Sequence, residues 1–449
     1  MYNRRVIKFL DKWRQRKQRK PLILRGARQV GKTSAVEIFA KRYFKYLIDI
    51  NLEKAEHLRL FNNQPSLDEF LTIIKAEFKI SIIPGETLIF IDEIQNSPHL
   101  IKLLRFFYEE RPELHIIVAG SLLEAMITRE GFSFPVGRVE FCYMYPLDFF
   151  EYLEAKQENE LLKMLKTYEL SQTIPEAIHQ MALRIFYEYA MIGGMPEAVA
   201  EYLSNHDINN VVKIYSALMA GYLDDVYKYA SQADAKYISF IIENAPLFAG
   251  TQITYEKFGG SNFRSREMSK AFTLLEKVRL LYQIRATQSN SLPLVPKERR
   301  AKKLIYVDIG LINYRLNVLN EYLSINDFGG FFRGKMAEQL VAQNIFSQYI
   351  DEVPRIYYWA RDRKEGSAEV DFCLNFKGKT LGVEVKSGKV GRLKSLSIFA
   401  KYNQESTLIR VYSGRLTKEK INNRNMISLP FYMVPRIFDF IDTNSGSSP

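Results

Sequence analysis

The sequence predicts an α/β protein in which a parallel sheet near the start is followed by helices and then by a second α/β region. Short apolar runs at residues 21–24, 87–91 and 115–120 have the length and composition of buried parallel strands. From about residue 147, apolar residues recur three or four positions apart, as is typical of helices. Near residue 370, apolar and polar residues alternate, which indicates half-buried strands.

Composition and charge limit the class of protein. The 449 residues are 47% hydrophobic and 25% charged, as in ordinary globular proteins. The formal net charge of +12 favours polyanionic partners such as nucleic acid, with a solvated basic surface as the alternative. Two cysteines and five scattered histidines exclude a zinc site or a disulfide framework, so we expect a reduced, cytoplasmic protein. No apolar stretch approaches about 18 residues, so no membrane insertion is expected.

The first apolar run leads directly into a glycine loop with the pattern GxxxxGK[ST], and a segment with helical spacing follows. This order is that of a phosphate-binding loop, in which backbone N–H groups and the helix N-terminus face the phosphates. Lys32 is expected to reach the β- and γ-phosphates, and the Thr33 hydroxyl to bind Mg²⁺. The residues predicted to contact the nucleotide are Gly26, Ala27, Arg28, Gln29, Val30, Gly31, Lys32, Thr33 and Ser34.

The second apolar run ends in two acidic residues, Asp92 and Glu93. Ligands of parallel sheets bind at the carboxyl ends of the strands, where these side chains would lie. We expect Asp92 to hold Mg²⁺ through water and Glu93 to polarise the attacking water as the catalytic base. A helix N-cap is the alternative for this acidic pair. The cofactors predicted from both segments are ATP and Mg²⁺.

Two further polar residues are candidates for the same site. Ser121 follows the third apolar run, where it would sense the γ-phosphate or cap the next helical turn. Arg138 lies on the glycine- and proline-containing loop at 134–138. It would act as an arginine finger on the γ-phosphate, or form an ordinary salt bridge.

The middle of the chain is predicted to be a helical lid, broken by a turn at Gly193-Gly194. Beyond it, Ser265 is expected to cap a helix, and a strand is expected at 280–284. The predicted buried residues of this helix are Met268, Ala271, Phe272, Leu275 and Val278. Its free face carries Arg266, Lys270 and Lys277, so helix and strand together suggest a winged helix that binds either DNA or a protein.

The alternating segment near residue 370 places Glu369 and Asp371 on one face of a strand. A turn at 377–379 leads to a second strand, on which Glu384 and Lys386 share a face. Pairing of the two strands would bring Asp371, Glu384 and Lys386 together. Glu338, on a helix that begins after Gly334, is expected to lean over the same place.

This constellation resembles that of the PD-(D/E)xK nuclease superfamily, although Val370 replaces the usual proline. The resemblance implies that Asp371 and Glu384 bind Mg²⁺ and that Glu338 completes the site or holds a second ion. Lys386 would position the attacking water or stabilise charge on the scissile phosphate. The alternatives are a salt-bridged hairpin and an inactive nuclease relic that only binds.

Several blocks together resemble one branch of prokaryotic AAA-superfamily ATPases whose C-terminal domain is of unknown function. They are Gly26–Thr33, Phe90–Gln95, Ala119–Ser121, Gly137–Arg138, Tyr145–Glu151, Ile192–Glu197 and Tyr306–Leu311. The resemblance covers essentially the whole chain. The predicted parts are a P-loop parallel-sheet ATPase core (1–146), a helical lid (147–235), a winged helix-turn-helix (236–300), an α/β restriction-endonuclease-like domain (301–442) and a disordered tail (443–449).

The function expected from these parts is that of an ATP-hydrolysing, DNA-associated protein whose nucleotide state controls a Mg²⁺-dependent nuclease-like domain. The alternative is a nucleotide-gated signalling switch or scaffold whose nuclease-like domain is inactive and only binds. DNA is the expected partner in the first case and a protein in the second. Self-association is compatible with both.

Overall fold

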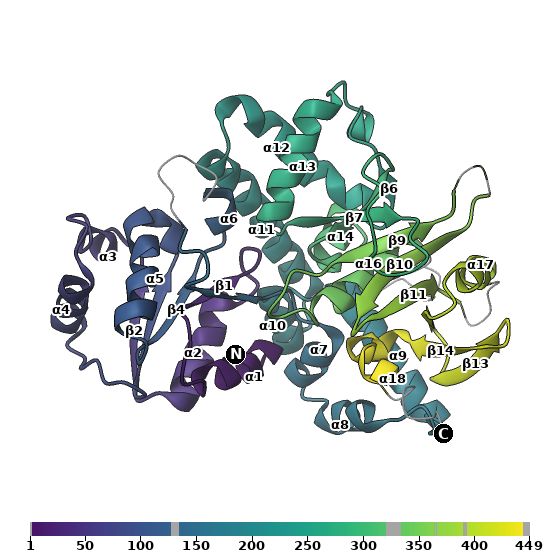
Figure 1. Ribbon diagram of the computed structural model, residues 1–449, viewed down its shortest axis with the longest axis horizontal. Helices are drawn as coiled ribbons and strands as arrows, with labels where there is room; N and C mark the ends of the chain where they lie inside the picture. The colour runs from purple at the N-terminus through teal and green to yellow at the C-terminus, as the bar shows by residue number, and fades with distance from the viewer. Residues whose placement is uncertain are drawn as a thin grey trace.

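The computed structural model describes residues 2–126, 134–319, 334–362, 364, 366–388 and 393–442. The tail at 443–449, for which disorder is predicted, lies outside the described residues. The strands form a five-stranded sheet and a nine-stranded sheet. Figure 1 shows the first sheet in the N-terminal part of the chain and the second in the C-terminal part, with helices between them. No helix of the described part is long and apolar enough to cross a membrane.

The first sheet is parallel throughout, with the order β2-β3-β4-β1-β5. Its strands are β1 (Leu22–Arg25), β2 (Tyr46–Asn51), β3 (Thr87–Asp92), β4 (His115–Ala119) and β5 (Glu140–Tyr143). The three predicted apolar runs form β1, β3 and β4, which lie in the interior of the sheet. Leu22 and Leu24 of β1 face one apolar core and Ile23 faces another, because alternate side chains of a strand point to opposite faces.

Helices cover both faces of this sheet (Figure 1). Those whose buried residues join the core of Leu22 are α1 (Arg5–Arg14) and α2 (Lys32–Tyr43). Those on the side of Ile23 are α3 (Ala55–Arg59), α4 (Leu67–Phe78), η1 (Ile94–Asn96) and α5 (Pro98–Glu110). Strands β2 and β5, which sequence reasoning missed, are edge strands of mixed burial, so their sequences lack a continuous apolar run.

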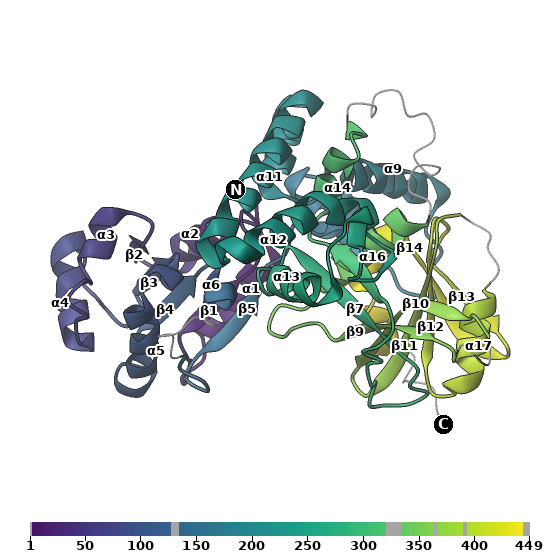
Figure 2. The ribbon, with the colours of Figure 1, turned by 90° about the horizontal axis from the view of Figure 1, so that it is seen from above.

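The predicted helical segment is helical and lies between the two sheets (Figures 1 and 2). Its helices are α7 (Phe149–Ala155), α8 (Asn159–Thr167), α9 (Glu176–Ile192), α10 (Pro196–Asn205), α11 (Ile208–Tyr229) and α12 (Gln232–Asn244), the last of which runs past the predicted end at 235. A short helix, α6 (Leu123–Met126), precedes the segment and follows β4. The predicted turn at Gly193 separates α9 from α10. Its φ is 89° and a Cβ there would lie 2.3 Å from Oδ1 of Asp308, so the turn requires glycine.

The second sheet is mixed, with the order β13-β14-β12-β11-β10-β9-β7-β8-β6. Its strands are β6 (Gln252–Ile253), β7 (Leu281–Thr287), β8 (Lys302–Tyr306), β9 (Ile356–Ala360), β10 (Glu369–Phe376), β11 (Lys379–Lys386), β12 (Thr407–Tyr412), β13 (Thr417–Ile421) and β14 (Arg424–Pro430). Strand β7 pairs with β8 and with β9. The predicted division at residue 300 therefore falls inside one sheet.

The helices of this region lie around the second sheet. They are η2 (Ala245–Phe248), η3 (Phe258–Gly260), α13 (Ser265–Lys277), α14 (Ile309–Arg315), α16 (Lys335–Phe346), α17 (Lys394–Tyr402), η5 (Phe431–Arg436) and α18 (Asp439–Asp442). The five residues predicted to be buried on helix α13 are buried, four of them within it and Val278 at its C-cap. Its N-cap is Arg264 rather than Ser265, because the Ser265 N–H donates to Oε2 of Glu256 at 2.8 Å and the chain is already helical there.

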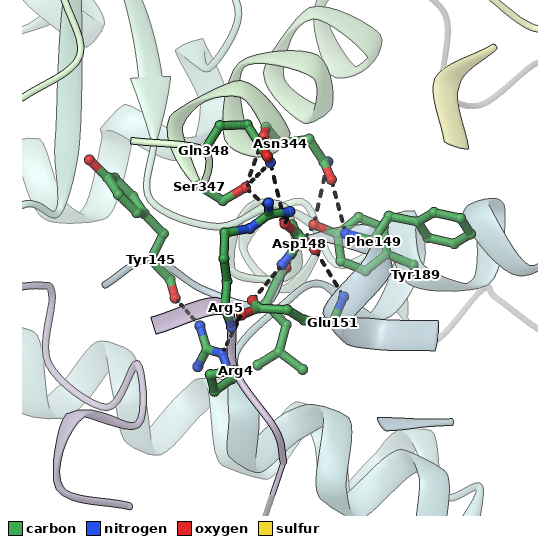
Figure 3. A network of polar contacts seen from close by, with 11 residues as sticks. Arg4, Arg5, Tyr145, Asp148, Phe149, Glu151, Tyr189, Asn344, Ser347 and Gln348 are labelled. Carbon is green, nitrogen blue, oxygen red and sulfur yellow. Dashed lines mark hydrogen bonds and ion pairs between the residues drawn. The ribbon is translucent and has the colours of Figure 1, made fainter. Parts of the chain in front are cut away.

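A buried polar network around Asp148 joins α1 and α7 to the residues just after α16 (Figure 3). Asp148 caps α7 by accepting from the Glu151 N–H at 2.9 Å, and its other oxygen accepts from Nη2 of Arg5 at 2.7 Å. Ser347 and Gln348, just beyond α16, each donate to that oxygen at 3.3 Å. Burial alone would raise the pKa of Asp148, but Arg5 and the Glu151 N–H outweigh it and hold the pKa below its ordinary value.

Replacing Asp148 by alanine is expected to lower the free energy of unfolding by about 3–5 kcal/mol, because it leaves polar partners from three segments unpaired. Asp207→Ala is the matched control. Asp207 also caps a helix, α11, but the hydrogen bond that it accepts from the Asn209 N–H is exposed to solvent. Loss of that cap alone should cost about 1 kcal/mol. Urea unfolding of both variants measures the difference, and equal losses would contradict a special role for the network.

The same experiment has a defined pH dependence. Because the pKa of Asp148 is lowered on folding, its stabilisation is present above the unfolded-state pKa of about 3.9 and is lost as the pH falls through the folded-state pKa. The gap between wild type and Asp148→Ala should therefore narrow in acid.

Candidate nucleotide site and C-terminal carboxylate cluster

The loop between β1 and α2 has the backbone conformation that a phosphate-binding loop needs. Gly31 has φ 89° and stands at the N-cap of α2, where it turns the N–H groups of the first helical turn toward the loop. Gly26 passes so close to β5 that a Cβ would lie 2.4 Å from the Met144 carbonyl oxygen. Both glycines of the motif are thus required by geometry.

Lys32 is the first residue of α2, and its largely buried side chain turns back onto this loop. Its Nζ donates to the carbonyl oxygens of Gly26 at 3.1 Å and Ala27 at 2.9 Å. Burial lowers the pKa of Lys32, against the opposing effect of the carboxylates of Glu93 and Asp92. The ammonium group is thus satisfied by neutral acceptors alone, and an anionic phosphate would be a stronger partner.

The two carboxylates predicted for this site lie at the carboxyl end of β3, beside the loop. Oγ1 of Thr33 donates to Oδ2 of Asp92 at 2.6 Å, so the two residues predicted to bind Mg²⁺ are in contact. Hydroxyl and carboxylate oxygens are the donor types that Mg²⁺ prefers, and the pair fits this ion. Burial raises the pKa of the neighbouring Glu93, whose carboxylate also accepts from Nε2 of Gln95.

A cavity of about 590 Å³ opens over the loop and the two carboxylates. The predicted residues that line it are Arg28, Gln29, Gly31, Lys32, Thr33, Ser34, Asp92, Glu93 and Ser121. Gly26, Ala27 and Val30 lie behind this lining, where their carbonyl groups accept from Lys32 and Arg4. Ser121 therefore lies in the same cavity as the phosphate-binding loop and the two carboxylates.

The cavity has further walls that sequence reasoning missed. They include Tyr2, Arg4, Asn51, Glu53, Pro196 and Glu197. Arg4 donates to the carbonyl oxygens of Val30 at 2.8 Å and Tyr145 at 2.6 Å, and its Nε lies 3.0 Å from Oε1 of Glu151. Tyr2 and Arg4 lie just before α1, Asn51 and Glu53 lie at and just after the end of β2, and Pro196 and Glu197 begin α10. No local sequence motif identifies them.

Arg138, the predicted arginine finger, does not line this cavity. Its Nε lies 2.9 Å from Oε1 of Glu109 on α5, with both side chains partly exposed. This is the salt bridge that the sequence left as the alternative. Within one chain, Arg138 is not placed to contact a bound nucleotide.

The phosphate-binding loop is joined to helix α11 through Arg28. The guanidinium of Arg28 pairs with the buried carboxylate of Asp225, and the Tyr222 hydroxyl donates to the Arg28 carbonyl oxygen at 3.2 Å. Farther along α11, the Tyr215 hydroxyl donates to the Ile192 carbonyl oxygen at 2.6 Å and lies 3.1 Å from Oδ1 of Asp308. One helix thus contacts both the nucleotide loop and the segment after β8.

In the C-terminal region, the predicted strand pair is present as β10 and β11. Lys377 and Gly378 both have positive φ and form the predicted turn between them. The register pairs Phe372 with Val383, which places Asp371 across from Glu384. Glu338 of α16 lies at the same place, since Lys303 contacts both Glu338 and Asp371.

Lys303 of β8 lies at the centre of this cluster and was not predicted. Its Nζ lies 2.7 Å from Oε2 of Glu338, 3.5 Å from Oδ1 of Asp371 and 3.7 Å from Oε1 of Glu369. Lys386 contacts Oε1 of Glu384 at 2.6 Å. The acidic residues predicted to hold Mg²⁺ therefore lie close together. However, the ammonium group of Lys303 lies among three acids of this cluster, Glu338, Glu369 and Asp371.

The other polar groups of the cluster bear on whether Mg²⁺ fits there. Oδ2 of Asp371 accepts from the Val385 N–H at 2.8 Å, so both oxygens of Asp371 have partners. Burial raises the pKa of Glu338 and of Glu384 to about 7, with the Asp371 charge as the next cause. Among the described residues, no group of three or more His, Cys, Asp or Glu is arranged to hold a metal ion.

Family models match three consecutive parts of the chain. A model described as an AAA domain matches residues 18–153, and two domains of unknown function match residues 183–322 (DUF8612) and 333–432 (DUF4143). No curated protein matches the sequence.

Solved structures with some likeness include an ORC2 protein of Aeropyrum pernix in ADPNP–ADP complexes, at 11% identity and a TM-score of 0.28, covering 71% of this chain and 93% of that one. The RuvB Holliday junction branch migration motor of Thermotoga maritima has 16% identity and a TM-score of 0.28, covering 66% and 93%. Structural likeness this weak says nothing about what this chain binds. Residues 18–153 are similar to an AAA domain, and the loop between β1 and α2 within them has the geometry of a P-loop.

Proposed function

We propose that the protein binds and hydrolyses ATP at the cavity over the phosphate-binding loop and acts as a nucleotide-gated switch. The observation that carries the first part is the contact of Thr33 with Asp92, with Glu93 next to it in the same cavity. Lys32 would exchange its two carbonyl acceptors for phosphate oxygens, which are charged and therefore stronger acceptors. Mg²⁺ held by Thr33 and Asp92 would neutralise charge on the phosphates.

Glu93 is assigned as the group that orients and deprotonates the attacking water. Its pKa is raised by burial, which makes its carboxylate a better proton acceptor than an exposed glutamate. Gln95 holds the carboxylate in place by donating to Oε2. Glu53 lines the same cavity, but it follows β2, which lies one strand farther than β3 from the strand that carries the phosphate-binding loop.

The gating part of the proposal rests on Arg28. A bound phosphate would compete with Asp225 for the Arg28 guanidinium, and Asp225 is buried on α11. The same helix reaches Asp308 through Tyr215, and Asp308 accepts from the Gly194 N–H at 2.7 Å and from Nε2 of Gln343 on α16 at 2.9 Å. Nucleotide state would thus bias the position of α11 relative to α10 and α16.

The partner of the switch is assigned as DNA, contacted through α13. Arg266 and Lys270 are exposed on the free face of this helix, and Lys277 is half-buried beside them. The formal charge of +12 supports a polyanionic partner. A protein partner on the same face is the alternative, and weakening of duplex binding by added salt would favour DNA.

A second candidate function is Mg²⁺-dependent cleavage of nucleic acid by the C-terminal cluster. It is favoured by the convergence of Asp371, Glu384 and Lys386 on the paired strands β10 and β11, with Glu338 nearby. The contacts of Lys303 count against it. We therefore favour a C-terminal domain that binds and does not cut.

Glu93→Gln is expected to keep ATP binding but to slow hydrolysis by about 10²–10⁴-fold, because the amide accepts no proton from water. Glu53→Gln, a second acid of the same cavity, is the matched control and should hydrolyse ATP normally. Lys32→Ala should abolish ATP binding. Calorimetric titration and phosphate release measure both properties, and normal turnover by Glu93→Gln would remove its assignment as the base.

Asp225→Asn is expected to raise ATP affinity by up to about fivefold, because the competing partner of Arg28 is lost. Arg28 is 34% exposed, so its ion pair is worth no more than about 1 kcal/mol. In wild type, ATP should speed amide hydrogen exchange at the C-terminal end of α11, and Asp225→Asn should show no such ATP effect. Asp224→Asn, at the exposed neighbouring position, is the control. An unchanged ATP effect in Asp225→Asn would contradict gating through this pair.

Plasmid digestion in Mg²⁺ tests the second candidate. We expect no cleavage by the wild-type chain with or without ATP, because Lys303 lies among the carboxylates that would have to bind the metal. Cleavage that disappears in both Asp371→Ala and Lys386→Ala would establish a nuclease instead. Cleavage that survives both substitutions would mark a contaminating enzyme.

A further inference from the structure

We infer that Lys303 is the built-in counter-cation of the C-terminal carboxylate cluster and stands where the resembling nucleases hold a divalent ion. The cluster would then be a closed ion-pair centre that binds no Mg²⁺. This inference does not depend on ATP hydrolysis, which takes place at the other sheet. It concerns a residue of β8 that belongs to none of the motifs of the sequence.

The ammonium group of Lys303 has a full set of acceptors. It donates to Oε2 of Glu338 at 2.7 Å, and it lies 3.3 Å from the Asp371 carbonyl oxygen and 3.5 Å from Oδ1 of Asp371. An ammonium group has three N–H donors, so these acceptors account for all of them. The acceptors belong to α16 and β10, the two elements that carry the first two acids of the predicted site.

The side chain of Lys303 is held where it is. Only 3% of it is exposed, and its strand is paired on both sides, with Gln252 of β6 and Ile284 of β7 opposite Lys303. The rings of Tyr358 and Phe372 lie 5.7 and 5.4 Å from Nζ. A metal ion that displaced the ammonium into water would have to drive the buried side chain out from between these rings and the carboxylates.

The remaining carboxylates already have partners of their own. Glu369 accepts from Nε2 of Gln252, and Glu384 accepts from Lys386 at 2.6 Å. Among the buried oxygens of these acids, Oε2 of Glu384 is without a hydrogen-bond partner. A single such oxygen is a poor site for Mg²⁺, which prefers octahedral coordination and is usually held by one or two carboxylates with waters.

The inference predicts that removing the ammonium group creates a cation site. Lys303→Met keeps the length of the side chain but leaves Glu338, Asp371 and Glu369 without their cation. We expect the full-length variant to bind one Mn²⁺ more per chain than wild type, and a second substitution, Asp371→Asn, to abolish this gain. Mn²⁺ is the probe because its free concentration is measured directly by electron paramagnetic resonance.

The titrations use metal-stripped, nucleotide-free protein, so that any binding at Thr33 and Asp92 is common to all variants. Lys302→Met is the matched control, because the adjacent Lys302 donates to the Tyr255 hydroxyl at 2.7 Å instead of to the cluster, and it should gain no site. A folded Lys303→Met that binds no extra Mn²⁺ would overturn the inference.

The wild-type chain provides a test that does not require Lys303→Met to fold. The Mn²⁺ isotherms of wild type and of Asp371→Asn should superimpose, because Asp371 of the wild-type chain would hold no metal and its replacement would therefore remove no site. A wild-type site that is lost in Asp371→Asn would show that a divalent ion binds beside Lys303 and would overturn the inference. Failure of ATP hydrolysis in Glu93→Gln, or its persistence, has no bearing on this comparison.

Discussion

The buried carboxylate of Asp148 is the polar contact that links the helices packed on the first sheet to those packed on the second. It joins Arg5 before the first sheet, the start of α7 and the end of α16, three segments that are far apart in the sequence (Figure 3). An uncompensated carboxylate at this depth would be costly, so all three segments must be in place together. One apolar core also runs through both sheets and the helices between them. The proposed nucleotide binding would therefore act on a structure that is packed as a unit.

Within this unit, a second buried carboxylate holds the turn between α9 and α10. Asp308 accepts from the Gly194 N–H, the Gly310 N–H and Nε2 of Gln343, and burial raises its pKa against these hydrogen bonds. The next helix, α10, contributes Pro196 to the nucleotide cavity. Asp308 lies five residues after Lys303, so β8 leads from the C-terminal cluster to this turn. This continuity links the C-terminal cluster to the turn beside the nucleotide cavity through a single strand.

Sequence reasoning succeeded where neighbouring residues alone determine the structure. The phosphate-binding loop, the acids after β3 and the turn at Lys377 each follow from a few consecutive residues. It missed the contacts of Arg4 with Val30, of Asp225 with Arg28 and of Lys303 with Glu338. The two residues of each pair are 26 or more positions apart and are brought together by packing. Lys303 gave one signal, a charged residue directly before the apolar run 304–306 of its strand, but a strand alone does not reveal which groups its charge contacts. The predicted domain boundary at residue 300 was wrong for the same reason. The turn-rich segment there joins β7 and β8, whose pairing is not visible in the sequence.

The two buried lysines show how different the two centres are. Lys32 contacts neutral carbonyl oxygens, and burial lowers its pKa, so its charge is poorly compensated and an incoming phosphate would stabilise it. Burial alone would also lower the pKa of Lys303, but the carboxylates of Asp371 and Glu338 outweigh burial and raise it. The charge of Lys303 is thus already matched inside the protein. An anionic ligand has an electrostatic reason to enter the first centre, whereas at the second centre the lysine already gives these carboxylates the positive charge that a metal ion would bring.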